Sequence, residues 1–264
     1  YSATLNVSGT GILTNAPTGT ITTLVGTGGP RTLGVQLDNQ GLITINQPLT
    51  LSRASAAHVN SGTIDATAAD FTLNQSGTAP SFTTISTGTL TIGAGRTLTV
   101  SSGTFTQGGT LSGGGTLTLT NVTSNFTNPF TLAALNVSGG TASFATNLST
   151  GVQVLTFLNT TINGPGTITN PVGQTLSLRS VTFNTDLINQ GTLITDGGTT
   201  VAATNAFTAA AGSTLRLQAT GSTGNSTFTA APFTNDGAIE LTTTVAAYSA
   251  TLNVSGTGIL TNAP

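Results

Sequence analysis

A stretch of seventeen residues occurs twice in this chain and limits the possible folds more than any other feature. Residues 1–17 read YSATLNVSGTGILTNAP, and residues 248–264 repeat them letter for letter. Identity at a fixed offset is typical of an array of structural units rather than of a unique globular core. We therefore expect residues 1–247 to form one repeat block and residues 248–264 to begin the next identical block.

A shorter sequence repeat occurs inside the block. A polar residue is followed two positions later by glycine and four positions later by an aliphatic residue, as in NQGLI at 39–43 and STGTL at 86–90. The glycine markers are spaced by about 21 to 30 residues, and their mean near 25 predicts about ten coils. We expect six of these markers to form structural corners: Gly41, Gly62, Gly88, Gly166, Gly191 and Gly237.

Polar and apolar residues alternate strictly between the glycines. Residues 89–92 read TLTI and residues 116–120 read TLTLT. Period two over four to six residues, rich in threonine and aliphatic side chains, predicts half-buried strands. Helical spacing is nearly absent. Because two or three short strands cannot bury a face alone, each coil must stack on the next. The predicted fold is all-β, a parallel β-helix or β-solenoid.

Phenylalanines recur at intervals close to one coil. In a parallel β-helix such residues would form a ladder of rings along the core. We expect this core ladder to consist of Phe82, Phe105, Phe126, Phe157, Phe183, Phe207 and Phe228.

Other all-β architectures fit the sequence less well. A transmembrane β-barrel needs alternating segments of roughly 9 to 11 residues with aromatic girdles, and this chain has two tyrosines and no tryptophan. A sandwich does not explain a coil-length glycine rhythm that continues across the repeat. A β-propeller closes on itself, whereas this chain starts another copy.

The composition excludes several classes of partner and site. The chain has no cysteine, which excludes disulfides and thiolate metal sites. Five basic and seven acidic residues provide no basic surface for nucleic acid. No apolar run approaches the roughly 20 residues of a membrane-spanning helix. We expect no nucleic-acid partner and no membrane span.

The few ionisable residues do not suggest an active site. Glycosidases generally need two carboxyl groups at a defined separation, and the nearest acidic pairs in the sequence are Asp65 with Asp70 and Asp236 with Glu240. Isolated acidic residues beside glycine are most simply turn residues. His58 is the single histidine and is expected at the surface or a corner, since one imidazole makes no transition-metal site. We expect no catalytic residue, no cofactor and no metal.

Outward threonines offer a different kind of surface. Stacked Thr-x-Thr motifs can in principle match a regular lattice such as ice or a crystalline polysaccharide. The motif occurs at 20–22, 89–91, 97–99, 116–120 and 167–169. These sites do not share one clear phase within a coil, and outward threonine often reflects only strand propensity.

The glycine corners at 39–43 and 86–90, the TLT strands and the near absence of charge together resemble a known family. They are similar to the secreted β-solenoid surface proteins of bacteria, such as filamentous-haemagglutinin-type adhesins and autotransporter passengers. The resemblance implies export, an extracellular or cell-surface location and a right-handed β-helix. No binding or catalytic motif of that family matches residues here.

The perfect repeat favours a shaft over a single adhesin tip. Because the pattern is already running at residue 1 and still running at residue 264, we expect the sequence to be a window on a longer assembly. The expected function is a structural extracellular fibre or shaft segment whose partners are copies of itself, joined end to end covalently or by stacking. The alternative is an adhesin that binds glycan, ice or another regular surface.

Overall fold

The computed structural model describes residues 2–263. These residues contain strands and turns and no helix, and they form parallel stacked strands. The chain divides into two compact units, unit 1 (Tyr1–Asn136) and unit 2 (Val137–Pro264). The all-β parallel β-solenoid predicted from the alternation is therefore confirmed.

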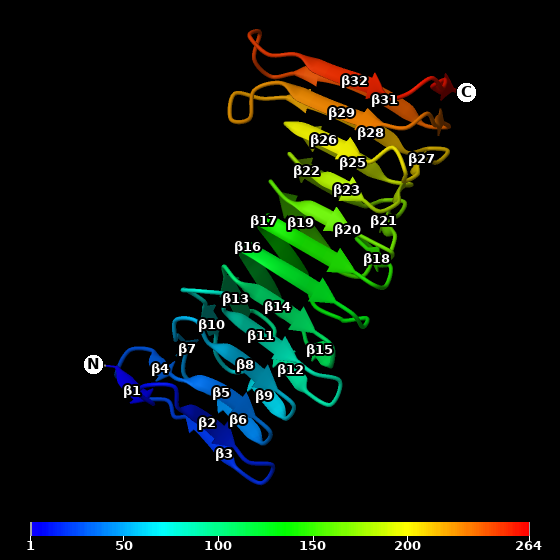
Figure 1. Cartoon of the computed structure of the whole chain (residues 1–264). Helices are drawn as coiled ribbons and strands as arrows, with labels where there is room; N and C mark the ends of the chain where they lie inside the picture. Colours follow the sequence, from blue (N-terminus) through cyan, green and yellow to red (C-terminus); the bar gives the residue numbers. More distant parts are fainter. Residues whose placement is uncertain (1, 264) are drawn as a thin grey trace. The chain divides into compact units, whose positions relative to one another are not determined.

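Unit 1 is built from turns of three strands, and equivalent strands of successive turns pair in parallel (Figure 1). Row A contains β1 (Ala3–Asn6), β4 (Arg31–Gly34), β7 (Leu49–Leu51), β10 (Phe71–Asn74), β13 (Thr97–Ser101) and the first half of β16 (Thr116–Phe126). Row B contains β2 (Ile12–Asn15), β5 (Gln36–Asn39), β8 (Ala57–Asn60), β11 (Ser81–Thr84), β14 (Thr104–Gln107) and the second half of β16. Row C contains β3 (Thr20–Thr23), β6 (Leu42–Ile45), β9 (Thr63–Ala66), β12 (Thr89–Ile92) and β15 (Thr110–Ser112).

Unit 2 has the same plan. Row D contains β19 (Val154–Leu158), β22 (Thr175–Arg179), β25 (Thr192–Asp196), β28 (Thr214–Ala219) and β31 (Ala238–Thr243). Row E contains the second half of β17 (Ala134–Phe144), β20 (Thr161–Asn163), β23 (Thr182–Asn184), β26 (Gly198–Val201), β29 (Ser226–Ala230) and β32 (Ala250–Val254). Row F contains β18 (Leu148–Ser149), β21 (Ile168–Asn170), β24 (Leu187–Asn189), β27 (Phe207–Ala209), β30 (Thr234–Asn235) and β33 (Thr261–Asn262).

The core of each unit lies between the rows and follows from the period-two pattern. In β13, Leu98 and Val100 are fully buried, while Thr97 and Thr99, which alternate with them, are partly exposed. Successive side chains of a strand point to opposite faces, so one face of every strand meets the other two rows inside the turn. Parallel pairing then places each inward side chain on its equivalent in the next turn.

The number of turns differs from the sequence estimate. Residues 2–263 make about 12 turns of about 21 residues, where the glycine rhythm predicted ten of about 25. Turn length also varies along the chain. The register partners Arg31 and Leu49 are 18 residues apart, whereas Ala3 and Arg31 are 28 residues apart. A single mean spacing therefore does not describe the turns.

The error arose because the marker glycines belong to more than one corner. Gly62 precedes a row C strand, whereas Gly191 precedes a row D strand. At other corners the residue before the strand is not glycine, as at Asp186 before β24 and Ala206 before β27. Counting the glycines as one series therefore treated different corners of the turn as the same corner. It also missed the turns that have no glycine at the counted corner.

The seven phenylalanines are all buried but do not form one ladder. Phe82 and Phe105 are register partners on row B, with stacked rings 6.0 Å apart between centroids. Phe126 is on the same row and its ring lies 6.0 Å from that of Phe105, so these three rings follow one another, although the register partner of Phe105 is Ser124. In unit 2 the rings are distributed over three rows: Phe157 on row D, Phe183 and Phe228 on row E, and Phe207 on row F. A sequence spacing close to one coil does not show which of the three strands of a turn a phenylalanine belongs to. The prediction of a single ladder of seven rings is therefore corrected.

Candidate functional site

The corner glycines are required by close stacking of the backbone. A Cβ atom added to Gly62 would overlap the carbonyl oxygen of Gly41 in the turn below, and one added to Gly41 would overlap the carbonyl oxygen of Gly19. The same overlap with a backbone carbonyl exists at the other four predicted corners, Gly88, Gly166, Gly191 and Gly237. None of these six glycines has a positive φ. Glycine is therefore needed here for space and not for left-handed backbone.

Buried asparagines form a hydrogen-bonded ladder beside the unit 1 corners. Asn15 Nδ2 donates to Asn39 Oδ1 at 2.7 Å, and Asn39 Nδ2 donates to Asn60 Oδ1 at 2.7 Å. Each amide also donates to a backbone carbonyl, as from Asn39 to Thr63 at 3.2 Å. The three residues end strands β2, β5 and β8 of row B. An amide has two donors and one acceptor oxygen, so a parallel stack satisfies it in every turn.

Unit 2 has a second asparagine ladder, at the end of row F. Asn170 Nδ2 donates to Asn189 Oδ1 at 2.8 Å, and Asn235 Nδ2 donates to Asn262 Oδ1 at 2.7 Å. Between these pairs the register position holds Ala209. The ladder is therefore interrupted once and resumes in the next turn.

Sequence reasoning missed both ladders, although the signal was present. In the sequence analysis the polar residue of the glycine pattern was given no role of its own. At 39–41 and 60–62, and again at 189–191 and 235–237, it is asparagine two positions before the glycine. The spacing Asn-x-Gly combines a buried amide at a strand end with a residue small enough for the corner that follows.

His58 is buried and not at the surface, which corrects its predicted position. It is 2% exposed within β8, and its Nδ1 accepts a hydrogen bond from the Leu37 backbone N–H at 3.1 Å. Its ring lies 6.5 Å from that of Phe82, its register partner. The inward position follows from Asn60, because residues two apart on a strand share a face. Burial, aided by the charge of Arg53, lowers the pKa of His58 to about 4.

Two arginines form ion pairs with acidic side chains of the neighbouring turn. Arg179 Nη2 lies 2.9 Å from Asp196 Oδ2, and Arg216 Nε lies 2.5 Å from Glu240 Oε2. Both pairs are register partners on row D. Glu240 thus has an arginine partner on the neighbouring strand. These pairs are outward and partly exposed, so each of them adds little to stability.

Two of the other acidic residues accept hydrogen bonds from backbone N–H groups. Asp65 Oδ1 accepts from the Thr67 N–H at 3.0 Å, and Asp70 Oδ1 accepts from the Thr97 N–H at 2.9 Å. Among residues 2–263 no group of three or more histidine and acidic side chains is arranged to hold a metal ion. The described part of the chain also contains no helix that could cross a membrane.

Outward threonines of successive turns are aligned on row A, an arrangement that the sequence pattern did not reveal. Only the Thr-x-Thr sites at 97–99 and 116–120 lie on this row, while the sites at 20–22 and 89–91 lie on row C. One outward threonine from each of six turns nevertheless occupies the same register position. This threonine rank consists of Thr4, Thr32, Thr50, Thr72, Thr99 and Thr118.

The two identical segments occupy equivalent places relative to the ladders. In unit 1 the first copy supplies β1 and then β2, which ends in the ladder residue Asn15. In unit 2 the second copy supplies β32 and then β33, which ends in the ladder residue Asn262. Each copy thus forms the strand before the ladder strand and the ladder strand itself.

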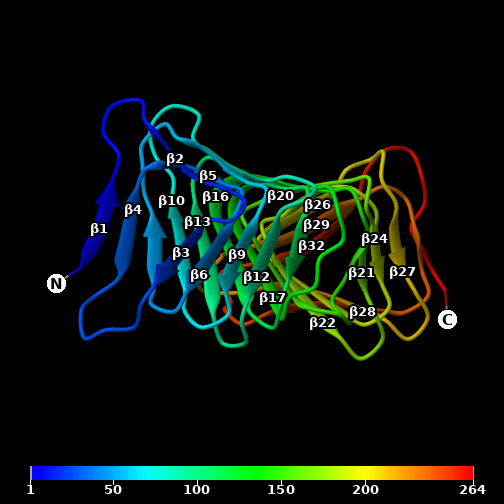
Figure 2. The ribbon, with the colours of Figure 1, turned by 90° about the horizontal axis from the view of Figure 1, so that it is seen from below.

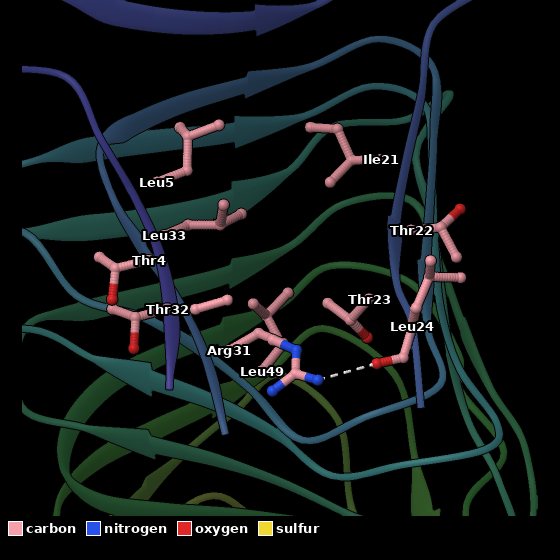
Figure 3. Close-up of a pocket in the computed structure, with 11 residues that line it drawn as sticks. Thr4, Leu5, Ile21, Thr22, Thr23, Leu24, Arg31, Thr32, Leu33 and Leu49 are labelled. Carbon is pink, nitrogen blue, oxygen red and sulfur yellow. Dashed lines mark hydrogen bonds between the residues drawn. The ribbon is translucent and has the colours of Figure 1, made fainter. Parts of the chain in front are cut away.

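The first copy borders an apolar opening into the unit 1 core. The opening has a volume of about 330 Å³, and its lining includes Leu5, Ile21, Leu33 and Leu49. Figure 3 shows these side chains around it, with Arg31 at one side donating from Nη2 to the Leu24 carbonyl at 3.1 Å. Leu5 is 45% exposed on β1, which lies beside β4 in Figure 2.

The stacked corners, the polar ladders and the parallel rows define the chain as a parallel β-solenoid. Comparison with protein families, with curated proteins and with solved structures finds no match to this chain.

Proposed function

We propose that this chain is a structural segment of an extracellular fibre or shaft, built by end-to-end continuation of identical blocks. The blocks are joined covalently in tandem or by stacking of separate copies. The observation that carries the proposal is the repeated segment, since both copies place the same strand pair and the same ladder asparagine on a parallel stack. In this proposal the chain has no catalytic role.

The chemistry of the stack suits a long-lived fibre. Each added turn pairs its backbone and its corner amides with the turn below, so stability increases with length as a sum of neighbour terms. The low charge of the chain limits repulsion between copies. Without cysteine or methionine the chain also lacks the side chains that oxidise most readily. The extracellular location and the likeness to bacterial secreted β-solenoids belong to the same proposal.

The shape and internal spacing of assemblies test this function. We expect purified protein, either as the chain of 264 residues or as several blocks in tandem, to form unbranched rods of one constant width in electron micrographs. Aligned rods should give a reflection near 4.8 Å along the rod axis, the spacing of paired strands. Only compact particles at all concentrations, or a 4.8 Å reflection perpendicular to the rod axis, would contradict the proposal.

The threonine rank supports a second candidate function, binding to a regular surface. Its six hydroxyl-bearing side chains repeat once per turn, about 4.8 Å apart along row A. We expect the triple variant T50V, T72V and T99V to lose freezing hysteresis or retention on crystalline polysaccharide if the rank binds such a surface. Valine keeps the β-branched shape and removes the hydroxyl. The matched control is T83V with T106V on row B, which should bind as the unmodified chain does.

A further inference from the structure

We propose that the end-to-end partner of this chain is a second copy whose residues 1–17 take the place of residues 248–264 on rows E and F. This inference rests on the proposed function and specifies its interface. The receiving strands are β29 and β30, and the incoming strands are β1 and β2 of the second copy.

The register of this junction can be taken from the second copy of the segment. Thr251 and Leu252 are the register partners of Thr227 and Phe228 on β29. Residues 248–264 and 1–17 are identical, so Thr4 and Leu5 are the equivalents of Thr251 and Leu252. On its other edge β1 pairs Leu5 with Leu33. The junction therefore runs in the continuous order Phe228, Leu5, Leu33.

The asparagine amides are compatible with this order. Asn262 uses its Oδ1 to accept a hydrogen bond from Asn235 Nδ2 at 2.7 Å. Asn15, its sequence equivalent, uses its Nδ2 to donate to Asn39 Oδ1 at 2.7 Å. The two bonds involve different atoms of the amide, so Asn15 of the second copy can make both. The ladder then continues from one copy into the next without an unsatisfied group.

The loop that joins β1 to β2, and its equivalent between β32 and β33, also makes different hydrogen bonds on its two edges. In the second copy of the segment, the Ser255 N–H donates to the Ala230 carbonyl at 2.8 Å. In the first copy, the Arg53 guanidinium donates to the carbonyls of Val7 and Gly9. One edge of the loop offers a donor and the other offers acceptors, so both sets of contacts can exist together.

The apolar surface is also complementary. Leu5 is 45% exposed and borders the apolar opening described above (Figure 3). On the receiving turn, the ring of Phe228 is paired with Leu252, the equivalent of Leu5. Docking would place Phe228 of one copy on Leu5 of the other and cover that edge of the opening.

Cysteine pairing tests the register, because the chain has no cysteine of its own. A chain carrying T4C is mixed with a chain carrying T227C under mild oxidation. Parallel partners lie about 4.8 Å apart, within the range of a disulfide. We expect an intermolecular disulfide between these two chains. Its yield should rise several-fold when the T227C chain also carries L252P, which weakens the hold of its own 248–264 segment, and should fall when free peptide 248–264 is added.

The matched control shifts one cysteine by two residues on the same outward face. T229C is about 8 Å from the T4C position in the proposed register, too far for a disulfide, and it should pair with N6C instead. The double variant T227C with T251C checks folding, since its disulfide should form within one chain. Equal yields for T227C and T229C with T4C, or no intermolecular product while the internal T227C–T251C bond forms, would overturn the proposed junction.

The two proposals fail differently in these measurements. If unbranched rods form but the T4C–T227C disulfide does not, the fibre function is supported and this junction is overturned. The specific disulfide in isolated pairs of chains that never extend into rods would support the junction and count against the fibre.

Discussion

At the scale of single residues, buried polar side chains specify the stack more sharply than the apolar ones. An aliphatic side chain tolerates small shifts of register, whereas an amide that accepts from the turn on one side and donates to the turn on the other fixes both. Asn39 shows this, because it accepts from Asn15 and donates to Asn60 and to the Thr63 carbonyl. Loss of one amide leaves a buried donor unpaired on one neighbour and a buried acceptor unpaired on the other.

Asn39→Ala should therefore destabilise unit 1 well beyond the loss of one average hydrogen bond. We expect the free energy of unfolding to fall by about 2–4 kcal/mol, because buried donors and acceptors are left unsatisfied in Asn15 and Asn60. Urea denaturation followed by circular dichroism measures this. Asn74→Ala, at an exposed strand end, is the control and should change stability by less than about 0.5 kcal/mol. Equal effects of the two substitutions would show that the ladder does not hold the corner.

His58 makes stability depend on pH. Its pKa is about 4 in the folded chain, below its ordinary value of 6.5, because burial disfavours the charged ring and Arg53 repels it. The unfolded chain therefore binds a proton before the folded chain does. Stability is fully present above pH 6.5 and is lost as the pH falls from 6.5 towards 4, by up to about 3 kcal/mol.

The measurement is urea denaturation at pH 7 and pH 4.5. His58→Gln, which keeps an acceptor for the Leu37 N–H, should remove most of the difference between the two pH values. Since His58 is the single histidine, no other side chain with an ordinary pKa near 6.5 contributes to this range. A difference that persists in the glutamine variant would contradict the assignment.

At the scale of elements, the corners determine where strands begin and end. Most strands have three to six residues, and many of the bends between them bring the backbones of successive turns too close together for a side chain. At Gly191 an added Cβ would overlap the carbonyl oxygen of Gln174, whereas at Gly198 it would meet no atom within 4 Å. Both glycines have negative φ or extended backbone, so the difference between them is one of space.

Gly191→Ala and Gly198→Ala form a matched pair within unit 2. Gly191→Ala should lower the free energy of unfolding by about 2–3 kcal/mol, since two backbone segments must move apart. Gly198→Ala should be neutral or slightly stabilising, because it restricts the unfolded chain. Thermal denaturation of both variants checks the order. A larger loss at Gly198 would contradict the close-stacking explanation of the corners.

The fold could be predicted from the sequence because alternation and glycine corners are local patterns. Segments such as Thr97–Ser101 show their strand type and buried face by themselves. The row to which a strand belongs depends on turn lengths that vary from 17 to 29 residues between register partners, and no local pattern encodes it. For that reason the phenylalanine ladder was wrong, and the threonine rank and the asparagine ladders were not seen.

At the scale of the whole molecule, the chain is held by neutral interactions. Backbone ladders, aliphatic and aromatic contacts and amide ladders recur in every few turns, whereas two ion pairs are found among residues 2–263. Both pairs are partly exposed, with side chains 15–45% accessible. Exposed pairs of this kind contribute about 0–1 kcal/mol each.

Thermal stability should therefore be nearly independent of sodium chloride concentration. We expect the Tm to change by no more than about 2 °C between 20 mM and 500 mM salt at pH 7.5, because the five basic and seven acidic residues are too sparse for repulsion or attraction to be screened strongly. Differential scanning calorimetry measures this, and Arg216→Ala, which removes one ion pair, should leave the salt response equally flat. A shift of more than about 5 °C in either direction would show that charges hold the turns together, and the neutral stacking on which the fibre proposal depends would then be wrong.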